Sequence, residues 1–123
     1  IRTRFTVAQI IAGATLLPAV AGLRYRMISC TAVAIGADAT TSTAVNISGT
    51  QSAAAAILVS FVTADLDRSE VHYDGEGTTG VVLADGASYV ANDANTAITI
   101  DDTVAETAGA TAIDINFTYC LEA

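Results

Sequence analysis

The residues best suited to bind a cofactor lie in a glycine-rich stretch near the middle of the chain. Residues 75–80 read GEGTTG and match the spacing G-x-G-x-x-G, in which a tight turn presents a pyrophosphate to the N-terminus of a helix. Here the apolar run VVLA follows, and it has no amphipathic helical pattern. We therefore predict a hairpin loop at residues 75–80 and no nucleotide site.

A second pattern has the oxygen spacing of a calcium loop. Asp65, Asp67 and Ser69 would supply oxygens at the first, third and fifth positions, and Glu76 falls at the twelfth. The sixth position, where the sharp turn needs glycine, is Glu70. We expect a charged helical turn here and no bound metal.

His72 is the only histidine, so the chain has few ways to build a catalytic centre. A hydrolytic triad would need His72 near an activated serine or cysteine and an orienting acid, and no G-x-S-x-G pattern is present. One histidine and two separated cysteines are too few ligands for a structural zinc site. We expect no catalytic, cofactor-binding or metal-binding residue and no enzymatic activity, with His72 at the surface or in an interface.

The two cysteines, Cys30 and Cys120, leave two interpretations open. They form a disulfide, or they are two small buried hydrophobic residues, which is the commoner case in a chain with a sufficient core. The glycosylation sequons at Asn46 and Asn116 lie inside predicted strands, so we interpret both as chance matches.

Alternating apolar and polar residues predict strands through most of the chain. In residues 23–36 one face is predicted to carry Leu23, Tyr25, Met27, Val33 and Ile35, and the other Arg24, Arg26, Cys30, Ala32 and Ala34. In residues 112–120 the apolar face carries Ile113, Ile115, Phe117 and Tyr119. Shorter strands are predicted at residues 43–49 (Val45 and Ile47 inward), 56–62 (around Ile57, Val59 and Phe61), 70–73, 80–84, 87–91 and 96–100 (Ile98 and Ile100 in phase).

The spacing of these strands predicts the fold class. Strands every 8 to 15 residues with turn residues between them are typical of a sandwich. We expect an all-β fold, a single-domain antiparallel β-sandwich of jelly-roll type covering residues 1–123, with a helical turn at residues 63–69.

Charge is distributed unevenly along the chain. The only charges in residues 1–36 are Arg2, Arg4, Arg24 and Arg26, whereas all 13 acids lie in residues 37–123 with Arg68. The acidic bulk argues against nucleic-acid binding, which needs clustered Lys and Arg. A basic segment on an acidic body suits docking onto an acidic protein surface. The alternative, that the arginines are solvated or satisfy nearby carboxylates, stays open.

The N-terminal region imitates a secretory signal, with two arginines, an apolar stretch and an A-x-A pattern. Gln9 and Gly13 interrupt the apolar run, which is too short to span a bilayer. We therefore expect neither a cleaved signal nor membrane association.

Four stretches carry a resemblance to a known group of proteins: TVAQIIAGATLLPAVAGLRYRMI, AIGADATTSTAVNISGTQSAA, VLADGASYVANDANTAITI and ATAIDINFTYCLE. They resemble virion proteins of tailed bacteriophages, in particular small β-sandwich head decoration or cement proteins. The resemblance covers nearly the whole chain.

The resemblance implies a homotrimer on the capsid surface that binds the major capsid protein, without a cofactor or a small-molecule substrate. By this analogy residues 1–6 form an extended arm to the capsid or a neighbouring subunit. The expected partner-binding residues are Ile1, Arg2, Thr3, Arg4, Phe5, Arg24 and Arg26. The alternative is a tail or fibre component that binds a receptor or glycan, although the chain has no Trp and only four Tyr to stack on sugar.

Overall fold

A computed structural model describes residues 1–40, 44–73, 81–82, 84–103 and 108–123. The hairpin loop predicted at residues 75–80 lies outside the described residues, as does Glu76 of the calcium-like spacing.

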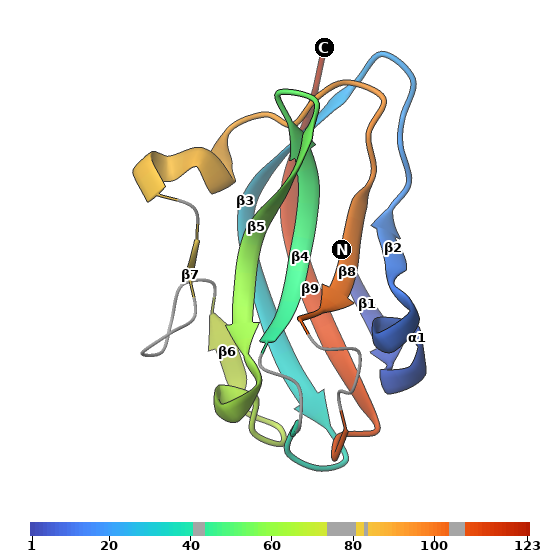
Figure 1. Ribbon diagram of the computed structural model, residues 1–123, viewed down its shortest axis with the longest axis vertical. Coiled ribbons are helices and arrows are strands. Elements are labelled where there is room, and N and C mark those ends of the chain that lie inside the picture. The colour runs from blue at the N-terminus through green and yellow to red at the C-terminus, as the bar shows by residue number, and fades with distance from the viewer. Residues whose placement is uncertain (41–43, 74–80, 83, 104–107) are drawn as a thin grey trace.

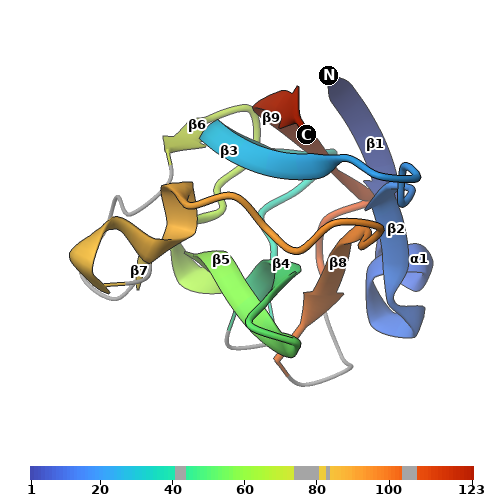
Figure 2. The same cartoon turned by 90° about the horizontal axis from the view of Figure 1, so that it is seen from above.

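The described chain forms two antiparallel sheets packed face to face (Figures 1 and 2). One sheet has the order β1-β9-β3-β6 and the other the order β2-β8-β4-β5-β7. The strands are β1 (Arg2–Thr6), β2 (Ala14–Leu17), β3 (Arg24–Ile35), β4 (Ala44–Gln51), β5 (Ala54–Val62), β6 (Val71–Tyr73), β7 (Val81–Val82), β8 (Ile98–Asp102) and β9 (Ala112–Glu122). The helices are α1 (Val7–Ala12) and the 3-10 helices η1 (Thr63–Asp65) and η2 (Ala84–Tyr89).

The connections between strands have the jelly-roll pattern. With the two-residue β7 set aside, successive strands alternate between the two sheets, and the β4–β5 hairpin is the single exception among the described strands. Alternation with one internal hairpin is the arrangement of an eight-stranded double Greek key. The predicted all-β, jelly-roll-like sandwich is therefore confirmed.

The core lies between the sheets. It is filled by large residues that are fully buried, including Ile47 and Phe61 from one sheet and Ile115 and Phe117 from the other. The predicted inward positions of β4, β8 and β9 are confirmed, because Val45, Ile47, Ile98, Ile100, Ile113, Ile115 and Phe117 are all fully buried. Burial of this apolar surface is the main stabilising contribution to such a fold.

A β-bulge in β3 reverses the predicted faces of its second half. The pairing register between β3 and β9 shifts between Met27 and Ser29, so that Ile28 has no counterpart in β9. One extra residue moves every later side chain to the opposite face. Tyr25 and Met27 therefore face the core as predicted, but Cys30, Ala32 and Ala34 are also buried, and the prediction that Val33 and Ile35 face inward is wrong.

A second register shift affects β5. Ile47 pairs with Val59 whereas Ser48 pairs with Ile57, so Leu58 is the extra residue. Leu58 and Val59 are both buried, and Ile57, which the pattern placed near the core, is exposed.

Three further expectations are corrected. The strand predicted at residues 87–91 is instead the end of η2 and the segment that follows it. His72, expected at the surface or in an interface, is buried on β6 with its ring 5.6 Å from that of Phe61. The helical turn predicted at residues 63–69 begins as η1 but ends at Asp65.

Helix α1 was not predicted. Thr6 and Gln9 form a capping box, in which the Thr6 hydroxyl accepts from the Gln9 backbone N–H and the Gln9 side chain accepts from the Thr6 N–H. This T-x-x-Q pattern is a recognised signal for a helix start. The helix connects β1 in one sheet with β2 in the other.

Candidate docking face on the four-stranded sheet

The outer face of the four-stranded sheet aligns side chains in two rows that cross all four strands. Strand pairing sets Arg2 beside Asn116, Asn116 beside Thr31, and Thr31 beside Tyr73. The second row runs in the same way through Arg4, Asp114, Val33 and Val71. The face is therefore charged over β1 and β9, and apolar and aromatic over β3 and β6.

The expected N-terminal arm is wrong for this chain, because residues 2–6 form an edge strand of the sheet. All five residues of β1 pair with β9, and the Ile1 amino group donates to the Phe117 carbonyl at 2.8 Å. Phe5 is only 4% exposed and belongs to the core. Inward-facing Phe5 anchors β1, whereas Arg2 and Arg4 project from the outer face.

Arg2 and Arg4 converge on a single carboxylate. Arg2 Nη2 lies 2.6 Å from Asp114 Oδ2, and Arg4 Nε lies 2.7 Å from Asp114 Oδ1. The carboxylate is 4% exposed, whereas the arginine side chains are 65% and 59% exposed. The guanidinium groups therefore cover the acid, and the surface presents positive charge.

This arrangement lowers the pKa of Asp114. The hydrogen bond from Arg4 is the largest cause, and the bond from Arg2 acts in the same direction, while burial of the carboxyl group opposes them. The same contact raises the pKa of Arg4. The cluster is therefore ionised at neutral pH, with two positive charges against one negative charge.

The other two predicted arginines, Arg24 and Arg26, lie at the opposite end of β3. Arg26 Nη2 is 2.6 Å from Glu122 Oε1, and the Arg26 contact lowers the pKa of Glu122. Along β9, the Arg24 pairing position is six residues from that of Arg2, about 20 Å at the rise of an extended strand. The sheet thus carries two separate basic clusters and not one patch.

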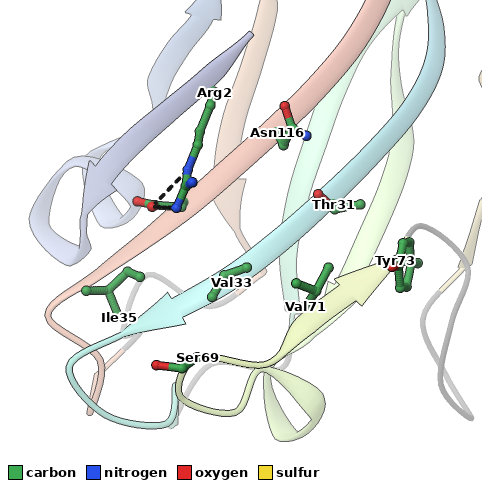
Figure 3. Close-up of a pocket in the computed structure, with 9 residues that line it drawn as sticks. Arg2, Thr31, Val33, Ile35, Ser69, Val71, Tyr73 and Asn116 are labelled. Carbon is green, nitrogen blue, oxygen red and sulfur yellow. Dashed lines mark hydrogen bonds and ion pairs between the residues drawn. The ribbon is translucent and has the colours of Figure 1, made fainter.

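A hollow of about 570 Å³ crosses this face (Figure 3). Its polar lining consists of Arg2, Asp114, Asn116, Thr31 and Ser69, and its apolar lining of Val33, Ile35, Val71 and Tyr73. Val71 and Tyr73, at the edge strand β6, are 47% and 56% exposed. Figure 3 shows Arg2 on one side and Tyr73 on the other.

Charge is divided between the two sheets and the connecting segments. The strands of the four-stranded sheet contain four arginines and two acids, Asp114 and Glu122, so they are net positive by two. The strands of the five-stranded sheet contain only Asp101 and Asp102 as charged residues. The rest of the sequence contains nine acids and one arginine, Arg68.

Other chemical candidates do not form a centre within the described residues. No group of three or more His, Cys, Asp or Glu side chains is close enough there to hold a metal ion. Neither cysteine is in a disulfide: Cys30 is fully buried and Cys120 is half-buried. Among those same residues, no helix is both long and apolar enough to cross a membrane.

Comparison with known proteins identifies no relative. No protein-family model, curated protein or solved structure matches the chain. Interpretation of the docking face therefore depends on the geometry described above.

Sequence reasoning named Arg2 and Arg4 but missed most of the residues around the hollow. Val33 and Ile35 were assigned to the core, and Asp114, Asn116, Thr31 and Tyr73 were given no binding role. One signal was available: the small residues Cys30, Ala32 and Ala34 are the cross-strand neighbours of Phe117, Ile115 and Ile113. Small residues beside large ones are typical of a packed inner face.

Proposed function

We propose that this chain is a structural virion protein that binds the outside of a bacteriophage capsid and stabilises it by bridging capsid subunits. In this role the chain is a homotrimer, and the four-stranded sheet faces the major capsid protein. The sequence resemblance to decoration proteins supports this function, and so does the jelly-roll fold, which is used in viral capsid domains.

The observation that carries the proposal is the one-sided charge of the fold. Strands that are net positive by two occur in a chain whose net charge is −8. Complementary potentials orient partners and accelerate their encounter, so the four-stranded sheet is suited to an acidic protein surface. Exposed Ile28, Val71 and Tyr73 on the same strands add apolar contact area.

The first test is location. Mass spectrometry of purified virions from the phage that encodes the chain is expected to detect it in proportion to the major capsid protein. Capsids stripped of the chain should lose heat resistance and regain it when purified chain is added back. A chain absent from virions, or one that does not bind stripped capsids, would overturn the proposal.

The second test is charge reversal on the docking face. The double variant Arg24→Glu with Arg26→Glu should weaken capsid binding at least about tenfold, because it opposes an acidic partner with like charge. Ala54→Glu with Ala55→Glu introduces two carboxylates at exposed positions of β5 in the other sheet, and should bind normally. Equal binding by the two double variants would remove the Arg24 and Arg26 end of the four-stranded sheet from the interface.

Deletion of residues 1–6, the natural test of an arm, is less informative here. The deletion would remove buried Phe5 and leave buried Asp114 without Arg2 and Arg4. Loss of capsid binding would then report damage to the sheet as well as loss of contact. Side-chain substitutions on the outer face avoid this ambiguity.

A second candidate function, a tail or fibre component that binds a glycan, is favoured by one observation. Exposed Tyr73 lines the same hollow as Thr31, Asn116 and Asp114, which combines an aromatic face for stacking with polar groups for sugar hydroxyls. Binding to a glycan array, abolished by Tyr73→Ala and with no affinity for capsids, would support this function over decoration.

A further inference from the structure

We infer that the hollow on the four-stranded sheet binds an extended acidic peptide segment, with a carboxylate over Arg2 and Arg4 and an apolar side chain from the same face of the peptide against Val33 and Val71. This inference names the partner chemistry of the docking face, and its biological meaning rests on the proposed function.

The charged end of the hollow has positive charge and hydrogen-bond donors available to bind an anion. Asp114 neutralises one of the two guanidinium groups and lies beneath them, almost fully buried. Every described hydrogen bond from these two arginines uses Nε or Nη2, so both Nη1 groups are available to an incoming carboxylate. Charge-assisted bonds of this kind are among the stronger hydrogen bonds in proteins.

The other end of the hollow is apolar, so it can contact a peptide side chain but offers nothing to a simple anion. Val33 and Val71 are cross-strand neighbours, and Ile35 extends the same surface. Val71 is 47% exposed on an edge strand, so a partner side chain can remove its apolar surface from water. Free phosphate would use only the arginine end, and a neutral sugar would leave the excess positive charge unmatched.

The dimensions fit a short extended segment. The rows cross from β1 to β6, three inter-strand spacings or about 14 Å. An extended chain covers that distance in about four residues at roughly 3.4 Å each. Successive side chains of an extended segment point to opposite faces, so an acidic residue followed two positions later by an apolar residue would place both kinds of side chain across the hollow.

The test uses the full isotope-labelled chain and two blocked hexapeptides, one with Glu and Val on the same face of an extended chain (Glu-Ser-Val-Ser-Val-Ser) and one with Gln in place of the Glu. Titration with the Glu peptide should shift the NMR signals of Thr31, Val33, Val71 and Asn116. Arg2→Gln should weaken its binding about tenfold, because it removes a charge-assisted contact. Ala55→Glu, an exposed site on the other sheet with the same change in net charge, should not weaken it.

A second variant tests the inference without disturbing the arginine cluster that supports the fold. Val71→Ser keeps Arg2, Arg4 and Asp114 intact and should weaken the Glu peptide several-fold through the apolar end alone. The inference is overturned by equal binding of the Gln peptide, by shifts outside the hollow, or by no binding at millimolar peptide. It is also overturned if phosphate or neutral sugars bind as well as the Glu peptide, or if a second copy of the chain occupies the hollow.

Failure of this inference can be distinguished from failure of the proposed function. A wild-type chain that binds and stabilises capsids but does not bind the Glu peptide in the hollow would overturn this inference while leaving decoration intact. Absence of the wild-type chain from virions would overturn decoration, whatever the peptides do.

Discussion

Asp114 is the residue on which the outer face of the four-stranded sheet depends most directly. It is almost fully buried, yet its carboxylate accepts four hydrogen bonds, two each from Arg2 and Arg4. A buried carboxylate without such partners would be costly. The same contacts hold the two arginines over β9, so this one cluster contributes both to the stability of the fold and to the charge of its surface.

Asp114 gives the fold a specific dependence on pH. Because its pKa is lowered in the folded chain, its contribution to stability is fully present above the unfolded aspartate pKa of about 3.9 and is lost as pH falls through the lower folded pKa. Asp114→Asn should destabilise the chain by about 1–2 kcal/mol at pH 7. The difference from wild type should shrink toward pH 2, as measured by urea unfolding across the pH range.

The control for this pH series is Asp67→Asn, which removes an acid from an exposed segment. Its stability should follow that of wild type closely, so it corrects for the change in net charge. A wild-type advantage over Asp114→Asn that stays constant from pH 6 to pH 2 would contradict the role assigned to the ionised carboxylate.

At the scale of elements, two register shifts determine which side chains reach the surface. The bulge at Ile28 directs Val33 and Ile35 outward and gives the hollow its apolar lining. The shift at Leu58 allows Leu58 and Val59 to be buried in succession. Strand β4, between β8 and β5, packs closely against the segment that follows η2, where Gly49 meets Asn92.

Gly49 is required by this close approach. A Cβ at this position would contact Asn92 Oδ1, and would lie 2.9 Å from Asn92 Cγ and 3.2 Å from Ile98 Cδ1. Asn92 cannot move away freely, because its backbone N–H and its side-chain amide both donate to the Tyr25 carbonyl, at 2.8 and 3.1 Å. Gly49→Ala should therefore cost about 1–3 kcal/mol, measured as a lower unfolding midpoint.

The neighbouring substitution Ser48→Ala is the matched control for Gly49→Ala. Ser48 lies on the same strand but faces the other side, and is half-buried. It should change the midpoint little. Equal midpoints for the two variants would show that the strand tolerates a methyl group at position 49.

At the scale of the whole molecule, positive and negative charges are separated in space, which the net charge does not show. The strands of the four-stranded sheet are net positive, while the strands of the five-stranded sheet and the rest of the sequence carry the negative excess. Such a distribution orients a molecule as it approaches a charged partner. It also favours solubility of the free chain, because the total charge stays far from zero.

If this orientation guides capsid docking, the association rate should depend on salt. Raising the ionic strength from about 0.1 M to about 1 M shortens the screening length from about 10 Å to about 3 Å. The association rate of labelled chain with stripped capsids should fall several-fold over this range, while the dissociation rate changes less. A salt-independent association rate would exclude electrostatic steering.

The alternation of apolar and polar residues was sufficient to predict the fold class, the long strands and many inward positions, because side-chain direction in an uninterrupted strand is a local property. The pattern failed after Ile28, since a bulge depends on the pairing partner as well as on the strand itself. It also did not predict the burial of His72, which needs β6 to lie over Phe61.

Composition and local pattern were sufficient for the jelly-roll-like sandwich, the absence of recognisable catalytic motifs, and the separation of arginines from acids along the chain. Strand pairing was needed to place residues 2–6 in an edge strand and to bring Arg2 and Arg4 to Asp114, more than 100 residues away. Composition and local pattern are properties of neighbouring residues. The hollow arises because strand pairing brings four distant segments into two rows, which no local pattern encodes.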